Sequence, residues 1–246
     1  MPLSHRLYYG MCIKYNAFRY TAFGREANRT LGSIELPDDV PTWVDSTAIP
    51  IHEGLATSAA PPVPLSGPAN WPQFTLGSLF NIYKGRRLTK ASRSPGSTRF
   101  VGASEKNNGI TDRNDVTPTF IGVCLTVPYN GNSVGWAFYQ DEPFFASDDV
   151  NVLIPKSIVS LWQLLFVASV IRHERPRYTY GYKWTLERMR ATHVRLPAAP
   201  DGGPDWDYME SLMRGLPFSA TVAAQQDATG SLKPGLEPER AVGALP

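Results

Sequence analysis

The sequence predicts an α+β fold with a small curved, mostly antiparallel β-sheet and a few short helices. Apolar residues make up 42% of the 246 residues, which is enough for a folded core. Proline and glycine contribute 22 and 20 residues, a share that favours many turns and argues against a long helical bundle. Between these turns lie short apolar runs, some typical of strands and some of helices.

The strand-like runs lie in the middle of the chain. Residues 120–127 form a β-branched apolar run between two prolines, and a second run spans residues 134–139. The turn-forming residues 129–132 separate the two runs, so we expect a hairpin. Residues 150–154 predict another short strand, and residues 79–83 fit either a strand or a short helix leading into Lys84.

Two helices are expected after these strands. Residues 158–171 form the longest mostly apolar stretch, with Ser157 as the expected N-cap. A bilayer span needs about 20 apolar residues, so this stretch predicts a buried helix and no membrane segment. Residues 185–192 predict a second, shorter helix.

Composition divides the chain into four parts. Residues 71–218 form the body, preceded by a proline-rich linker at 54–70 and followed by a tail at 219–246 that we expect to be disordered. Within residues 1–53, the sequence of 19–43 shares three ordered matches with residues 177–206 at similar spacing. We expect residues 1–53 to be a partial repeat of the closing segment of the body, although two unrelated segments with common residues would explain the same matches.

The two cysteines, Cys12 and Cys124, are too few for a disulfide scaffold or a structural zinc site. The first 20 residues carry scattered charges and no apolar run of signal-peptide length. These features predict a cytoplasmic protein.

Basic residues gather in two blocks although the net charge is only +2. Residues 84–106 hold seven cations and one anion, and residues 156–195 hold eight cations and two anions. A single cationic loop is more often a solvated surface, but two such blocks in one body favour contact with nucleic-acid phosphates. The segment 180–184 adds aromatic rings beside a cation on a tight turn, and the asparagines beside the first block can pair with adenine. The predicted DNA-binding residues are Lys84, Arg86, Arg87, Lys90, Arg93, Arg99, Lys106, Asn107, Asn108, Tyr180, Lys183 and Arg188.

No catalytic or cofactor signature stands out. The chain has no glycine-rich dinucleotide or S-adenosylmethionine fingerprint, no phosphate loop and no histidine pair at metal-binding helical spacing. We therefore interpret it as a binding protein without a cofactor of its own. One alternative is a hydrolase that uses Asp205, Asp207 and Glu210, although these acids also fit the N-terminus of a helix. The other is an interaction module for a glycan or a protein.

The order and spacing of several segments resemble the target-recognition domain of restriction-modification specificity subunits, of Type I and of the related Type II kind. The segments are Phe74-x-Leu76-x-x-Leu79-Phe80-x-Ile82-x-x-Gly85, Asn107-Asn108-Gly109-Ile110, residues 130–139, Val152-Leu153-x-Pro155-Lys156, Tyr180-Gly181-x-Lys183, Val194-x-Leu196-Pro197 and residues 204–210.

This resemblance implies a non-catalytic reader of double-stranded DNA that positions a partner DNA methyltransferase, and in some systems a restriction subunit, on a defined sequence. S-adenosylmethionine would be bound by the methyltransferase. Members of that family have two recognition domains separated by long helices, whereas this chain has one complete domain and no long helical spacer. The resemblance leaves three readings open: a truncated subunit, half of a pseudo-dimer, or a one-domain subunit that works as a homodimer.

Overall fold

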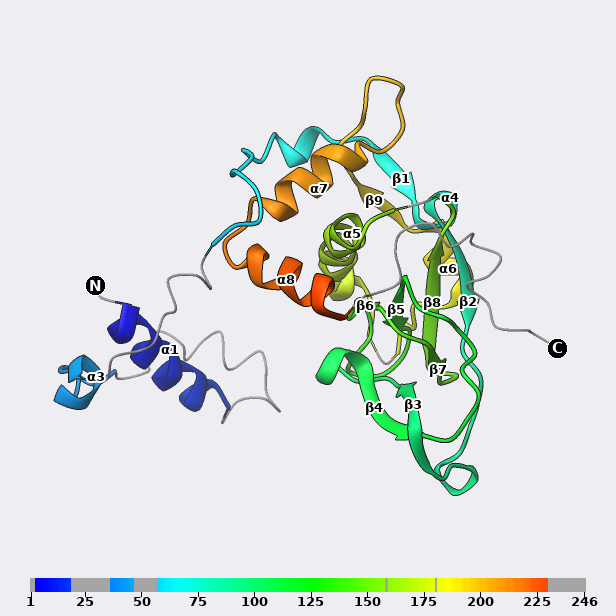
Figure 1. The fold of residues 1–246 in the computed structure, drawn as a ribbon, viewed down its shortest axis with the longest axis horizontal. Coiled ribbons are helices and arrows are strands. Elements are labelled where there is room, and N and C mark those ends of the chain that lie inside the picture. The colour runs from blue at the N-terminus through cyan, green and yellow to red at the C-terminus, as the bar shows by residue number, and fades with distance from the viewer. Residues whose placement is uncertain (1–2, 19–35, 47–56, 158, 180, 230–246) are drawn as a thin grey trace. The chain divides into compact units, whose positions relative to one another are not determined.

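The computed structural model describes residues 3–18, 36–46, 57–157, 159–179 and 181–229. The chain divides into two compact units, Met1–Glu53 and Gly54–Pro246, which Figure 1 draws with their elements labelled. In the smaller unit, helix α1 (Leu3–Phe18) contacts helix α3 (Thr42–Ser46), and the rings of Tyr8 and Trp43 meet edge to face at 6.1 Å. Residues 19–35, which hold the start of the expected repeat, lie outside the described residues, so the repeat remains a prediction.

A four-stranded antiparallel sheet forms the centre of the larger unit, in the order β2-β8-β5-β6. Its strands are β2 (Phe80–Lys84), β8 (Val150–Pro155), β5 (Cys124–Pro128) and β6 (Phe138–Gln140). The expected hairpin is confirmed, since Leu125 on β5 pairs with Tyr139 on β6, but its strands begin at Cys124 and Phe138 rather than at residues 120 and 134. All six residues of β8 are buried, because Leu153 packs into one apolar cluster and Val152 into a second.

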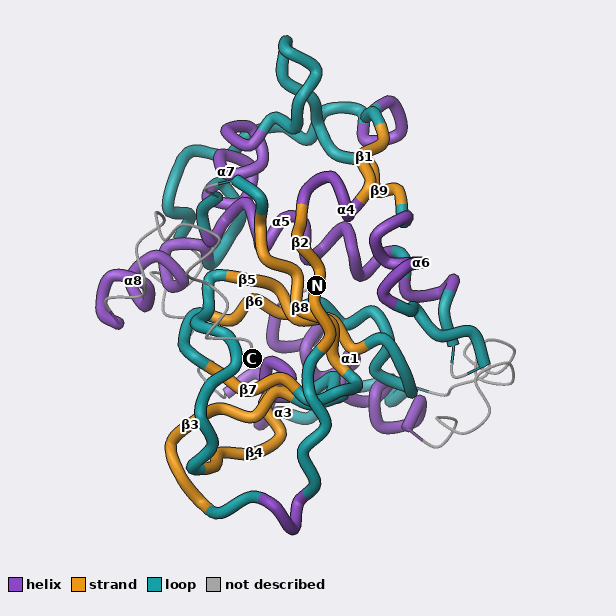
Figure 2. The backbone as a smooth tube through the Cα atoms, turned by 90° about the vertical axis from the view of Figure 1, so that its right-hand side faces the viewer, coloured by secondary structure: helices purple, strands orange, loops and turns teal. Residues whose placement is uncertain are grey.

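Two smaller sheets complete the strands of the described residues. Strand β3 (Pro95–Val101) pairs antiparallel with β4 (Ile110–Asn114) and parallel with β7 (Phe144–Ala146). Strand β1 (Gln73–Thr75) pairs antiparallel with β9 (His193–Arg195). Figure 2 shows the β3–β4 hairpin at one end of this unit and the β1–β9 pair near the other. The predicted α+β class with mostly antiparallel strands is confirmed.

Helix α5 (Leu161–His173) covers the central sheet and packs against α7 (Trp206–Arg214). Its N-cap is Ser160, so the prediction of Ser157 as N-cap was wrong. The Ser160 hydroxyl accepts from the Gln163 N–H, and the Gln163 side chain accepts from the Ser160 N–H, so both ends of a capping box are present.

The remaining helices are short. The predicted helix at 185–192 is confirmed as α6 (Leu186–Ala191), with Thr185 as N-cap and Thr192 as C-cap. Helix α4 (Leu76–Leu79) precedes β2, so residues 79–83 join the end of a helix to a strand. Single 3₁₀ turns lie at Pro68–Asn70, Lys90–Ser92, Asn107–Gly109 and Arg175–Arg177. None of the helices in the described ranges is long and apolar enough to cross a bilayer.

The described part of the linker packs onto the domain. The Tyr208 hydroxyl on α7 donates to the Pro64 carbonyl and accepts from the Ser66 N–H, both at 2.8 Å. A Cβ at Gly215 would lie 2.9 Å from the Pro61 carbonyl oxygen, so a glycine lets the two backbones approach closely. The expectation of a disordered tail from residue 219 was wrong for Ser219–Thr229, which form helix α8. Residues 230–246 lie outside the described residues.

Candidate nucleic-acid interface

The two basic blocks meet where β2 ends. Lys84, the last residue of β2, is paired with Asn151 on β8. The Asn151 carboxamide is buried and its Nδ2 lies 3.6 Å from the sulfur of Met189, which is buried on α6. A second contact joins the same elements, because Arg190 Nη2 on α6 donates to the Ile82 carbonyl on β2 at 2.8 Å. Helix α6, which carries Arg188, is therefore fixed against the strand that carries Lys84.

Tyr129 links the two blocks more closely. The Lys84 ammonium lies 5.1 Å from the centroid of the Tyr129 ring, within the range of a cation–π contact. The Tyr129 carbonyl accepts a 3.0 Å hydrogen bond from the backbone N–H of Trp184, the residue after Lys183. We name this region, comprising Lys84, Tyr129, Lys183 and Arg188, the basic junction. Lys84, Lys183 and Arg188 are exposed there, and none forms an ion pair with a described residue.

Other cations of the first block are also exposed. Arg86, Lys90 and Lys106 have no ion pair within the described ranges, so their charges are available to a ligand. Arg87 lies 3.4 Å from Asp148, but 80% of its side chain is exposed, so this pair holds it only weakly. Arg86 follows Gly85 in the segment that leaves β2, and its N–H donates to the Ala146 carbonyl.

Two predicted DNA-binding residues, Arg93 and Arg99, instead contact side chains of the domain itself. Arg93 stacks 4.0 Å above the centroid of the Phe100 ring and lies 3.5 Å from Asp112. Arg99 donates to Asp141 at 2.5 Å and pairs with Glu142 at 2.7 Å, and only 14% of its side chain is exposed. This arrangement is typical of structural ion pairs.

The side chains of Asn107 and Asn108 form hydrogen bonds within the domain. Asn107 and Asn108 have φ values of 49° and 54°, in the left-handed region that asparagine tolerates. Asn107 Nδ2 donates to the Ile110 carbonyl at 3.0 Å, and Asn108 Nδ2 donates to the Tyr139 carbonyl at 2.7 Å. The Asn107 amide therefore holds the turn before β4, and the Asn108 amide joins this turn to β6. Tyr180, the remaining predicted residue, lies outside the described residues.

The structure adds Tyr129 and Tyr182, which the list of predicted site residues lacked. Tyr182 lies in the aromatic segment 180–184 that the sequence did single out, whereas no local pattern marks Tyr129. Thr179 and Tyr182 exchange two backbone hydrogen bonds, of 3.1 and 3.0 Å, which close a tight turn. Tyr182 is 50% exposed, and the Arg188 guanidinium lies 4.1 Å from its ring centroid.

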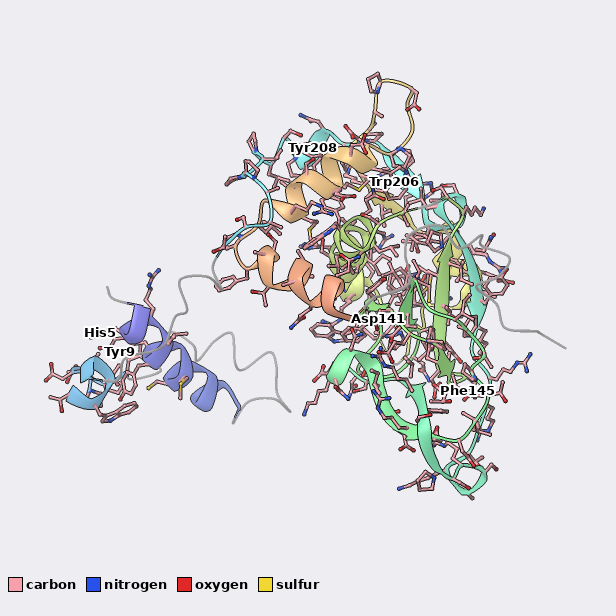
Figure 3. All side chains as sticks on the ribbon, viewed as in Figure 1. His5, Tyr9, Asp141, Phe145, Trp206 and Tyr208 are labelled. Atoms are coloured by element: carbon pink, nitrogen blue, oxygen red, sulfur yellow. The ribbon has the colours of Figure 1, made fainter. Side chains whose placement is uncertain are left out.

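Of the three acidic residues proposed for a hydrolase, Asp207 is exposed in the first turn of α7, and the other two have structural partners. Asp205 is the N-cap, with Oδ1 accepting from the Tyr208 N–H at 2.9 Å. Glu210 accepts from the Ser160 hydroxyl and from Arg214 Nε, each at 2.7 Å. Figure 3 shows Trp206 and Tyr208 on this helix, at the end of the unit away from Phe145. No group of three potential metal-binding side chains occurs in the part of the chain that the structure describes. The hydrolase alternative is not favoured by this geometry.

The geometry defines an α+β domain with a candidate binding surface, where exposed cations contact aromatic rings near the end of a strand. Residues 68–220, more than half of the chain, match the family model of the Type I restriction modification DNA specificity domain. The chain belongs to this family.

Comparison with individual proteins gives relatives of the same kind. Over 146 residues the chain is 41% identical to the Type II restriction enzyme BgcI specificity subunit S.BcgI of Heyndrickxia coagulans, covering 58% of this chain and 42% of that protein. The chain thus spans less than half the length of this curated relative. Two solved structures are similar. The S subunit of a Type I system from M. genitalium has 22% identity and a TM-score of 0.42, over 55% of this chain and 36% of that one. The HsdS subunit from Thermoanaerobacter tengcongensis has 14% identity and a TM-score of 0.46, over 93% of this chain and 54% of that one.

Proposed function

We propose that this chain is the DNA-reading component, or part of one, of a restriction-modification system. In this proposal it binds a defined sequence of double-stranded DNA and supplies no catalytic group of its own. Membership of the DNA specificity domain family and the 41% identity to a specificity subunit support the proposal. The single structural observation that carries it is the basic junction, where cations from two distant parts of the chain meet.

The junction suits a duplex for electrostatic reasons. Lys84, Lys183 and Arg188 are exposed, and Arg86 follows shortly after Lys84 in the chain. Cations that contact phosphates release condensed counterions, so the affinity falls steeply with added salt. Such contacts set the register of a protein on DNA, while other side chains read the base edges. Lys84 and Lys183 of the junction therefore supply the positioning part of recognition.

The proposal extends to partners. Because the chain belongs to a family of restriction-modification specificity domains, we assign it a DNA methyltransferase subunit that binds S-adenosylmethionine as its partner. A restriction subunit can join the same assembly, and two copies of the chain would supply the second half-site as a homodimer. An assembly of this kind acts on DNA inside the cell, so we propose the cytoplasm as its location.

Selection from a random duplex library tests the proposal directly. The whole chain should enrich a defined sequence, and its affinity for that sequence should fall linearly on a plot of log K against log salt. Each phosphate contact contributes about 0.9 to the slope, so replacing Lys84 and Lys183 with alanine should lower the slope by about 2. A chain that enriches no sequence would refute the proposal.

Lys156 offers a matched control, because it follows β8 at the opposite end of the β2–β8 pair from Lys84. Lys156→Ala removes one positive charge outside the junction, so we expect an unchanged slope. Equal effects of Lys84→Ala and Lys156→Ala would show that only net charge matters. A second measurement addresses the partner: a methyltransferase subunit from the same host should co-purify with the tagged chain.

A further inference from the structure

A column of stacked side chains runs from the core to the surface beside the basic junction. Trp184 is fully buried, and its ring stacks on Tyr178 with centroids 4.4 Å apart and planes 9° apart. Tyr178 in turn stacks on Tyr182, at 5.9 Å and 11°. The Arg188 guanidinium caps the column, 4.1 Å from the Tyr182 ring centroid. We call these four residues the ring column.

The base of the column is anchored by hydrogen bonds. Trp184 Nε1 donates to the Thr192 hydroxyl at 2.9 Å, and the Tyr178 hydroxyl lies 3.2 Å from the same oxygen. The Thr192 hydroxyl donates to the Arg188 carbonyl at 2.7 Å, which connects the base of the column to the helix that carries its cap. The closed turn between Thr179 and Tyr182 holds the exposed ring in place. The ring on which Arg188 stacks is therefore held in place before any ligand arrives.

In this arrangement the Arg188 guanidinium keeps two hydrogen-bond donors that no described residue uses. Arg188 Nη1 donates to the Lys183 carbonyl at 2.8 Å, and no described residue accepts from its Nε or Nη2. No acidic side chain within the described ranges pairs with it, in contrast to Arg87 and Arg99. A pocket of about 380 Å³ opens beside it, lined by Gln73, Arg177, Tyr178, Tyr182, Arg188 and His193 among others.

We propose that Arg188 reads a guanine edge in the bound duplex, and that Tyr182 is its positioning residue. A planar guanidinium with two neighbouring free donors matches the O6 and N7 acceptors of guanine, the commonest specific contact of arginine in the major groove. Stacking on a ring lowers the conformational freedom that the side chain would lose on binding. The proposal rests on the proposed DNA-reading function and adds to it the residue that discriminates one base pair.

Arg188→Lys separates base reading from phosphate contact, because lysine keeps the charge and loses the planar fork. The probe is the sequence that the wild-type chain enriches from a random duplex library. We expect Arg188→Lys to lose the preference for guanine at one position, with about 10- to 100-fold less discrimination there and unchanged preference elsewhere. The slope of affinity against salt should stay the same.

Tyr182 variants test the positioning role. Tyr182→Phe keeps the stacking face and should retain the guanine preference, whereas Tyr182→Leu should weaken discrimination at the same position as Arg188→Lys. Lys183→Ala serves as the neighbouring control: no ring of a described residue makes a cation–π contact with Lys183, so we expect a lower salt slope and an unchanged sequence preference. Circular dichroism and thermal unfolding identify any variant that fails to fold.

The outcomes are distinct. If Arg188→Lys retains every base preference, or if Arg188→Ala lowers the affinity for all sequences equally together with the salt slope, Arg188 contacts a phosphate and the inference is overturned. The proposed function survives that result, because the wild-type chain still selects a sequence. A wild-type chain that selects none overturns both.

Discussion

Replacing Arg99 with alanine tests whether this cation stabilises the fold rather than binding DNA. Its guanidinium donates to Asp141 and pairs with Glu142, and 14% of the side chain is exposed. A buried charge-assisted hydrogen bond contributes about 1.5–3 kcal/mol. The Asp141 side chain is 29% exposed and that of Glu142 is 52% exposed. Solvent therefore weakens the ion pair with Glu142, which contributes less to stability than the one with Asp141. We expect Arg99→Ala to lower the free energy of unfolding by about 2–3 kcal/mol.

Urea unfolding followed by circular dichroism measures this loss, which corresponds to about 5–10 °C in melting temperature for a domain of this size. Adding Asp141→Asn to Arg99→Ala should cost less than the sum of the single changes, because the two residues share one interaction. Arg86→Ala is the control: Arg86 is exposed and without an ion pair in the described ranges, so the stability should change by less than about 0.5 kcal/mol. Unchanged stability of Arg99→Ala, with a lower salt slope of DNA binding, would refute the assignment of Arg99 as structural.

Three further changes test the packing. Trp184→Ala should lower the stability by about 3–5 kcal/mol in urea unfolding, because a fully buried ring and its hydrogen bond are lost; near-wild-type stability would contradict the ring column. Ser160→Ala should cost about 1 kcal/mol by the same assay through loss of the capping box, whereas Ser157→Ala should cost nothing measurable. Burial raises the pKa of Tyr139 to about 12 from the ordinary value of 10, so the stability that Tyr139 contributes should be constant below pH 10 and be lost as the pH rises to about 12. Burial also raises the pKa of the Cys124 thiol, so in alkaline unfolding curves Tyr139→Phe should lessen the fall in stability without removing it.

Local patterns predicted the elements whose signals are contained in a few neighbouring residues. The hairpin of β5 and β6 follows from two apolar runs around a turn-forming segment, and α6 lies within the helix expected at residues 185–192. Helix α8 was missed because its alanine-rich composition resembled a disordered tail. Its first residues instead hydrogen-bond with the linker: the Ala220 N–H donates to the Thr57 carbonyl, and the Ser219 hydroxyl accepts from the Ala59 N–H.

The sequence by itself determined the α+β class, the order of most elements and the presence of two cationic blocks, because each depends on composition or on neighbouring residues. Only the tertiary structure decided which cations are available to a ligand. Arg99 lies in a basic block, yet Asp141, far along the chain, neutralises it. Tyr129, in contrast, contacts both Lys84 and Trp184, the residue after Lys183. Charge acts through space, so its partners are known only once the strands have brought separate parts of the chain together.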